Sequence, residues 1–367
     1  MNRYDAAVII CILAALSAGV FGLVRFHTFD VPYRIEYNDG LSGEGTHPVK
    51  KAENQEVRIG EFFRKTGTLP AKLESASWSG FRGDDRSNVV QDSSALADEW
   101  KSEGPRVVWR QKLGEGYAAP VIKDNLVYLL DYDEAEEADS LRCFSFETGQ
   151  EIWRRYYKVA VRRNHGKSRT VPAVAGKAVV SLGPMGHVMS VDALSGDLFW
   201  TKDLVREFGS EIPQWYAGQC VLADGNSVIL APAGKDVLMI AFDAVSGKEL
   251  WRTPNPDGIK MSHSSVMKYT LRGQPQYVYC GTGGTVGVAA EGENAGKILW
   301  RNTEWKPPVT APSPVKIGDA KIFMCAGYGF GGAVLEVKED GSAKILKACK
   351  PEKGVSSEQQ TPVIYGK

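Results

Sequence analysis

The sequence predicts an all-β protein, a β-propeller built from four-stranded antiparallel blades. Three observations predict this fold. The 367 residues include 39 Gly, 18 Pro and 9 Trp, a mixture typical of tight turns joining short strands around aromatic anchors. A Gly-x-x-x-Trp motif recurs at a regular interval, and a motif of small residues recurs in phase with it. An interval of roughly 40 to 50 residues is typical of four-stranded propeller blades.

The Gly-x-x-x-Trp motif marks the outer part of each blade. Four copies are complete, Trp109 anchors an earlier partial copy, and Gly341 begins a degenerate one. Successive Trp residues lie roughly 44 to 51 residues apart. We expect each Trp to be wedged between adjacent blades with its indole N–H on a backbone carbonyl, while each Gly takes a positive φ. Stacking on a cofactor is the alternative role for these Trp residues. The complete copies are Gly149 with Trp153, Gly196 with Trp200, Gly247 with Trp251, and Gly296 with Trp300.

The second motif opens each unit with a small residue or Pro before an apolar strand. It recurs about every 48 residues. A turn rich in Gly, Asp or Asn follows, and then a strand of β-branched or aromatic residues, which together predict hairpins. Five units are complete, and residues 360–367 begin a sixth. The motif lies at Pro120, Pro172, Cys220, Ser265, Pro314 and Pro362.

The composition narrows the classes of function. Lys plus Arg number 44 and Asp plus Glu number 44, so the net charge is zero. Without a net positive field, we expect no binding to nucleic acid. Apolar residues make up 43% and charged residues 24%, which is usual for a globular protein.

The N-terminal 77 residues are expected to divide into an anchor and a linker. Residues 6–24 carry no charge, and as a helix they would span about 28 Å, close to the thickness of a bilayer core. We therefore expect residues 1–25 to be a membrane anchor or a cleaved signal sequence, and the length of the run favours the anchor. Residues 26–77 are expected to form a polar linker with one short helical turn over residues 59–64. The propeller would then occupy residues 78–367.

No residue is predicted to be catalytic, and no metal site is predicted. The six Cys residues are dispersed and form no C-x-x-C pattern, and His165, His187 and His263 are isolated. An acidic run over residues 131–139 lacks the spacing of a calcium loop, so we expect a solvated hairpin loop there instead. A basic stretch over residues 154–169 ends in Arg169, a candidate for binding an anionic ligand. Charge balance with the acidic run is the simpler explanation of that stretch.

Several segments together resemble the PQQ-like β-propeller repeat proteins. These are the Gly-x-x-x-Trp motifs, the Asp-Ala-x-Ser-Gly turns that begin at Asp192 and Asp243, and the segments 78–88 and 202–215. The family is related to quinoprotein alcohol dehydrogenases and to BamB-type outer-membrane assembly propellers. The resemblance implies that the propeller lies on the extracytoplasmic, periplasmic side of a membrane. It also implies about eight blades, so we expect this chain to be a C-terminally incomplete version of a longer protein. A closed ring with the last residues paired near Trp109 would contradict that expectation.

The resemblance leaves two functions open. The quinoprotein dehydrogenases hold PQQ against a Trp and a ring of two adjacent half-cystines, beside Ca²⁺, whereas this sequence has no Cys-Cys pair. We therefore expect a binding or scaffolding module whose loops contact another envelope protein or a small ligand at the propeller funnel. The alternative is a PQQ-dependent dehydrogenase of an alcohol or sugar, in which Trp215 or Trp305 would stack on the quinone. A hydrolase or lyase is a third possibility, which the spacing of carboxylates does not support.

Overall fold

The computed structural model describes residues 57–73, 77–90, 97–100, 102, 104–162 and 167–365, all within one compact unit, Glu56–Lys367. The predicted membrane anchor, residues 1–25, and most of the predicted linker lie outside the described residues. Within the described residues, no helix is long and apolar enough to cross a membrane.

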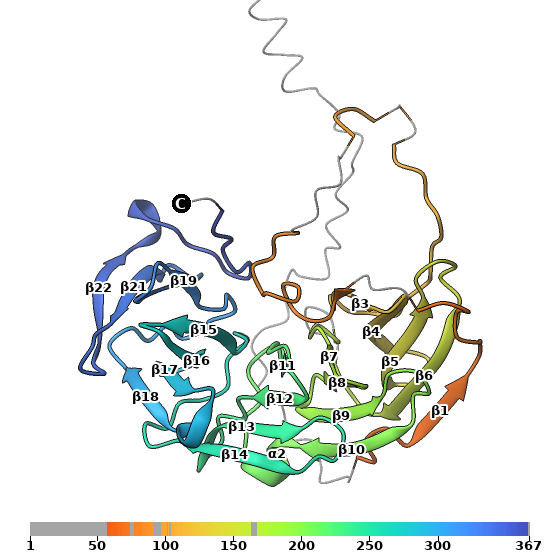
Figure 1. The fold of residues 1–367 in the computed structure, drawn as a ribbon, viewed down its shortest axis with the longest axis horizontal. Helices are drawn as coiled ribbons and strands as arrows, with labels where there is room; N and C mark the ends of the chain where they lie inside the picture. The colour runs from red at the N-terminus through yellow and green to blue at the C-terminus, as the bar shows by residue number, and fades with distance from the viewer. Residues whose placement is uncertain are drawn as a thin grey trace, which may run out of the picture. The chain divides into compact units, whose positions relative to one another are not determined.

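Five antiparallel sheets follow one another along the chain, and the prediction of four-stranded blades is confirmed (Figure 1). In each blade the strands pair in chain order, so every connection between neighbours within a blade is a hairpin. Blade 1 comprises β3 (Val121–Lys123), β4 (Leu126–Asp133), β5 (Ala138–Ser145) and β6 (Glu151–Lys158); blade 2 comprises β7 (Ala173–Ala175), β8 (Ala178–Leu182), β9 (His187–Asp192) and β10 (Leu198–Asp203); blade 3 comprises β11 (Leu222–Asp224), β12 (Ser227–Leu230), β13 (Val237–Asp243) and β14 (Glu249–Pro254); blade 4 comprises β15 (Met267–Leu271), β16 (Gln274–Gly281), β17 (Gly284–Ala289) and β18 (Ile298–Asn302); blade 5 comprises β19 (Val315–Ile317), β20 (Lys321–Ala326), β21 (Gly331–Val337) and β22 (Ala343–Cys349).

Among the residues that the structure describes, helices are few and short. The α-helix α2 (Leu204–Phe208) follows blade 2, and its N-terminus is capped by the Asp203 carboxylate, which accepts from the backbone N–H groups of Val205 and Arg206. Two 3₁₀ turns, Gly292–Asn294 and Pro351–Lys353, are the other helical elements in the described part of the chain.

Local sequence explains the first hairpin. Lys123 pairs with Leu126 around a two-residue turn. Asp124 and Asn125 fill this turn with φ values of 52° and 59°. Asp and Asn tolerate this left-handed conformation better than other non-Gly residues, and turns of this kind match the twist of the flanking strands.

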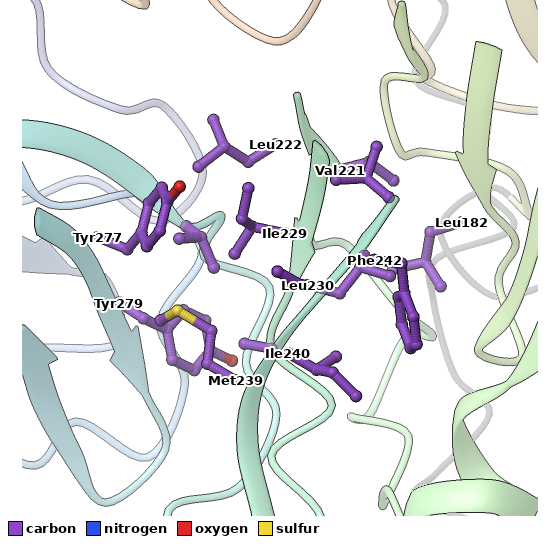
Figure 2. Close-up of a cluster of buried hydrophobic side chains, with 14 of the residues drawn as sticks. Leu182, Val221, Leu222, Ile229, Leu230, Met239, Ile240, Phe242, Tyr277 and Tyr279 are labelled. Atoms are coloured by element: carbon purple, nitrogen blue, oxygen red, sulfur yellow. The ribbon is translucent and has the colours of Figure 1, made fainter. Parts of the chain in front are cut away.

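The central strands of the blades are apolar on both faces because each blade is covered by its two neighbours. In β13, Leu238, Met239 and Ile240 are all buried although successive side chains point to opposite faces. Figure 2 shows side chains of β8, β12, β13 and β16 gathered in one buried cluster, so the largest part of the core spans blades 2, 3 and 4.

In the four complete motifs, each Gly lies against the Trp ring of the preceding unit. Gly196 and Gly247 have φ values of +75° and +68°. A Cβ added to Gly247 would lie 2.6 Å from the ring of Trp200, and one added to Gly196 would lie 2.8 Å from the ring of Trp153. The glycines are therefore required both for the turn and for the approach of the Trp ring.

The indole N–H groups connect adjacent blades. Trp153 Nε1 donates to the Ala193 carbonyl at 3.2 Å, and Trp200 Nε1 donates to the Ala244 carbonyl at 2.9 Å. Trp109, which lies outside any strand, donates in the same way to the Phe146 carbonyl at 2.7 Å. Trp300 differs, because its Nε1 donates to Gln276 within its own blade.

The second motif also joins the blades, through a series of hydrogen bonds that we call the inner relay. The backbone N–H of one unit donates to the side chain at the same position of the next unit. Cys220 N donates to Ser265 Oγ at 3.0 Å, and Ser265 N to Ser313 Oγ at 3.0 Å. Ser313 N donates to Thr361 Oγ1 at 2.8 Å, and the N–H of Val171 contacts Cys220 Sγ at 3.3 Å.

Replacing Ser265 by Ala is expected to lower the free energy of unfolding by about 1–3 kcal/mol, because the buried N–H of Cys220 loses its acceptor. Chemical denaturation measures the loss. The matched control is Ser265→Cys, since Cys220 Sγ already serves as an acceptor at this position. Equal stability of the Ala and Cys variants would show that the relay contributes nothing.

The N-terminal side of the propeller differs from the expectation of a linker with a helical turn. Residues Phe62–Lys65 form a strand, β1, which pairs with β6, and β2 (Ser77–Trp78) pairs with β3. The first sheet therefore has six strands. The helical-turn expectation is wrong because the free edge of β6 offers a ladder of hydrogen bonds, and Phe62 stacks on Tyr156 with ring centroids 5.3 Å apart.

At the C-terminal side, residues 361–365 form no strand. The expected first strand of a sixth unit is therefore present only as its leading residue, Thr361, which takes its place in the inner relay. Val363, Ile364 and Tyr365 are exposed. A strand requires a neighbour with which to form a ladder, and within the described residues this segment has none.

Candidate functional site

Four side chains from separate loops meet on one side of the propeller. Arg169, Trp215 and His263 precede the innermost strands of blades 2, 3 and 4, and Tyr328 lies between β20 and β21. Because strands alternate in direction within a blade, both kinds of connection lie on the same side, which we call the site side. The rings of Trp215 and Tyr328 are stacked with centroids 5.9 Å apart, and the Trp215 and His263 rings are 6.1 Å apart. We call these four residues the aromatic cluster.

The backbone is strained at this cluster. Trp215, Tyr216 and Tyr328 have φ values of 68°, 71° and 54°. For bulky residues such a conformation costs on the order of 1–3 kcal/mol each and persists where the surroundings impose it. Tyr216 N donates to the Pro213 carbonyl, and Tyr216 OH donates to the Arg162 carbonyl at 2.8 Å, so this turn is held at both ends. Strain of this kind concentrates at functional sites.

His263 is neutral at pH 7. Burial, together with the nearby Arg169 charge, lowers the pKa of its imidazole to about 4, although hydrogen bonds with the backbone of Gln214 and Tyr216 oppose the shift. Its Nδ1 is buried and has no hydrogen-bond partner among the described residues. A Cβ added to Gly218 would lie 2.8 Å from this Nδ1, so the absence of a side chain at residue 218 makes room for the ring.

Arg169 supplies the positive charge of the cluster. Burial lowers the pKa of its guanidinium, and the phenols of Tyr216 and Tyr117 offset part of that effect. An Arg side chain stays charged in proteins even so. Tyr328 is 56% exposed and Tyr117 is 74% exposed, so aromatic surface beside this charge is open to solvent. A cation, stacked rings and a neutral imidazole together suit the binding of an anionic or planar group.

The structure brings together two of the three predicted binding residues and separates the third. Arg169 and Trp215 both adjoin His263. Trp305 is only 6% exposed and packs edge-on against Phe330, in the core shared by blades 4 and 5, so it does not face the aromatic cluster.

Sequence reasoning set His263 aside as isolated and did not consider Tyr328. A signal for His263 was present, because Arg169 and His263 both lie two residues before an inner-relay position, Val171 and Ser265. Their shared place in the repeat puts both beside the centre of the propeller. Tyr328 carried no such signal, since its loop has no counterpart motif in the other units.

The expectation of a solvated hairpin loop is confirmed for residues 134–137, the exposed turn between β4 and β5, but not for the rest of the acidic run. Asp131 and Asp139 are buried on β4 and β5. Arg142 Nη1 lies 2.8 Å from the Asp131 carboxylate. Arg154 Nη1 lies 3.0 Å from the Asp133 carboxylate, so the interpretation as charge balance between the basic and acidic stretches fits the structure.

Beside Arg169, a buried carboxyl group is held by two hydroxyl groups. Ser168 Oγ donates to Asp139 Oδ1 at 2.5 Å, and Tyr157 OH donates to Oδ2 at 2.9 Å. Burial raises the pKa of Asp139 to about 7, although both hydrogen bonds act against the shift, and Asp131 adds to it. Asp139 therefore titrates near neutrality, and its hydrogen-bond partner Ser168 adjoins Arg169 of the aromatic cluster along the chain.

The donors for a metal ion are not assembled here. Over the described ranges, no group of three or more His, Cys, Asp or Glu side chains is placed to hold a metal ion. Cys143, Cys220, Cys280 and Cys325 are free and buried, and Cys349 is free and partly buried.

Comparison with known proteins points to one family. Residues 137–345 match the family described as outer membrane protein assembly factor BamB. No curated protein matches the chain. Among solved structures, similarity is found to BamB from Moraxella catarrhalis, with 16% identity over 68% of this chain and 76% of that chain, and a TM-score of 0.36.

Two dehydrogenases are also similar. The quinohemoprotein alcohol dehydrogenase from Comamonas testosteroni shares 14% identity over 65% of this chain and 43% of that chain, with a TM-score of 0.44. A europium-containing methanol dehydrogenase shares 12% identity over 68% of this chain and 57% of that chain, with a TM-score of 0.43. This chain thus spans less than two thirds of the length of either dehydrogenase.

Proposed function

Since this chain belongs to the PQQ-like β-propeller family of the outer membrane protein assembly factor BamB, we propose that it is an extracytoplasmic binding or scaffolding module. In this proposal residues 1–25 anchor it in the membrane, and its partner is another envelope protein or a small ligand. The aromatic cluster is the contact site. No nucleic acid is involved, because the chain carries no net positive charge.

The observation that carries this proposal is the arrangement of Trp215, Tyr328 and Arg169 on the site side. Aromatic residues and Arg are the types that contribute most to binding at protein interfaces. Trp215 and Tyr328 both have a strained backbone conformation with positive φ. Such strain concentrates at functional sites. We therefore expect the binding energy to be concentrated here.

A photo-crosslinking amino acid at residue 328 tests the proposal in the cell. We expect it to form an adduct with one envelope partner, and we expect Arg169→Ala or Trp215→Ala to reduce that adduct at least tenfold. The matched control is the same crosslinker at residue 146. Phe146 is 41% exposed in the turn between β5 and β6, on the side opposite the aromatic cluster. Equal adducts at both positions, or none at residue 328, would contradict the proposal.

A PQQ-dependent dehydrogenase is the second candidate. It is favoured because Arg169 and Trp215 both lie close to His263. The donor set fits this function poorly. No two Cys residues are adjacent in the sequence, and the described part of the chain gathers no set of acidic side chains for Ca²⁺.

Calorimetric titration of PQQ, with and without Ca²⁺, separates the two candidates. A binding module without quinone chemistry should give no heat of binding. Saturable binding at micromolar or lower concentration would favour the dehydrogenase if it required Ca²⁺ and was lost in Trp215→Ala but kept in Trp305→Phe. The Trp305 variant is the control because that ring lies in the core.

A further inference from the structure

Residues 77–90 cross the opening between the first and last blades; we call them the axial segment (Figure 1). They contact the innermost strands in turn. The segment begins in β2, which pairs with β3 of blade 1. The Ser79 carbonyl accepts from Val174 N of β7 at 2.8 Å. Arg86 then donates to the Ala223 carbonyl of β11.

Arg82 joins the axial segment to the C-terminal side of the propeller. Its side chain is 7% exposed. Nη1 donates to the Thr361 carbonyl at 3.1 Å, and Nη2 donates to the Pro362 carbonyl at 2.9 Å. Nε donates to the Arg86 carbonyl and Nη2 also to the Ser87 carbonyl, which fixes the guanidinium within its own segment. The rigid fork of Arg allows one side chain to make all four contacts.

The contact between Arg82 and residues 361–362 is linked to blade 5, which contributes Tyr328 to the aromatic cluster. Thr361 Oγ1 accepts from Ser313 N, which leads directly into β19 of blade 5. Tyr328 belongs to the same blade, between β20 and β21, and stacks on Trp215, which precedes blade 3. Blade 5 must therefore be held at a fixed distance from blade 3 for this stacking to persist. The connection from β18 to β19 and the packing between blades supply part of that restraint.

We infer that Arg82 is a positioning residue for the aromatic cluster. By holding residues 361 and 362 against the axial segment, it fixes blade 5 relative to blades 1 to 3. It thereby keeps Tyr328 stacked on Trp215. The inference concerns the geometry of the cluster and holds for whichever partner the cluster binds.

The test compares Arg82→Ala, Arg82→Lys and the control Arg301→Ala in the full chain. Arg301 is half-exposed and contacts Asp257 at 3.3 Å, so its loss removes an Arg without touching the axial segment. Hydrogen exchange of the Ser313 amide reports on the C-terminal contact, and the Val180 amide of β8 serves as an internal reference. The near-UV circular dichroism difference between each variant and its Tyr328→Ala derivative reports on the stacked pair.

For Arg82→Ala we expect exchange at Ser313 to become at least tenfold faster while exchange at Val180 is unchanged. We also expect the dichroism difference due to Tyr328 to fall by more than half. Arg82→Lys should restore part of both signals because an ammonium still reaches a carbonyl, and Arg301→Ala should match the unmodified chain.

Two results would overturn the inference. In the first, Arg82→Ala keeps the full Tyr328 difference. In the second, exchange rises equally at Ser313 and Val180, which would mean that Arg82 supports global stability only. If Arg82→Ala does not fold, Thr361→Val decides the question. It removes the acceptor of Ser313 N on the other side of the same contact. A Tyr328 signal unchanged in that variant would refute the positioning role.

Discussion

Replacing Trp153 by Ala is expected to lower the free energy of unfolding by about 3–5 kcal/mol. The ring is fully buried between blades 1 and 2. It lies 6.0 Å from the Tyr128 ring and covers Gly196 of the next blade. The substitution also removes the indole N–H from the Ala193 carbonyl, which keeps only the Tyr128 hydroxyl as a donor. Urea denaturation followed by far-UV circular dichroism measures the change.

The matched control is Trp109→Ala. Trp109 covers Gly149 and donates to the Phe146 carbonyl, as Trp153 does for Gly196 and Ala193, but its ring is only half-buried. We expect a loss of about 1–2 kcal/mol there, in proportion to the smaller apolar area removed from water. Similar losses for both variants would show that the inter-blade position of Trp153 adds nothing to stability.

Replacing Asp139 by Asn is expected to stabilise the protein at pH 8 by up to about 4 kcal/mol. Burial raises the pKa of Asp139 to about 7 in the folded chain, against an unfolded value of about 3.9. The folded state therefore binds the proton more tightly than the unfolded state. The resulting stabilisation is complete below about pH 4 and is lost as the pH rises to about 7.

The measurement is the free energy of unfolding as a function of pH for the original chain and for Asp139→Asn. The original chain should lose stability between about pH 4 and pH 7 relative to the variant, which keeps the uncharged form throughout. Asp243→Asn is the control of opposite sign, because hydrogen bonds from Ser246 lower the pKa of Asp243. If the two profiles ran parallel, Asp139 would not be the buried titrating group.

The sequence was sufficient to predict the blades because each unit carries its own signals. The Gly-Trp spacing, the turn residues and the alternation of strands act within about 50 residues, so a period in the sequence becomes a period in space. Trp153 and Trp200 illustrate this, since each packs on the Gly of the following unit. Prediction failed for β1, because a short segment without a pattern becomes a strand only when the edge of β6 is available.

The sequence also did not predict which acidic side chains are buried. Asp131, Asp133 and Asp139 belong to one acidic run, for which the sequence predicted a solvated hairpin loop, and the structure confirms this only for the exposed turn at residues 134–137. Asp139 instead lies under Ser168 and Tyr157, and Asp131 faces Arg142 from the next strand. These partners come from other strands and loops, and no local pattern of residues encodes which carboxylate they will cover.

By itself, then, the sequence determined the period, the four-stranded blades and the residues that join one blade to the next. Only the tertiary structure decided which loops meet. Arg169, Trp215, His263 and Tyr328 come from four separate connections, and Trp305, equally conspicuous in the sequence, is buried elsewhere. The physical reason is that packing within a blade depends on neighbours in the chain, whereas a site at the centre of a propeller depends on the curvature accumulated over all its blades.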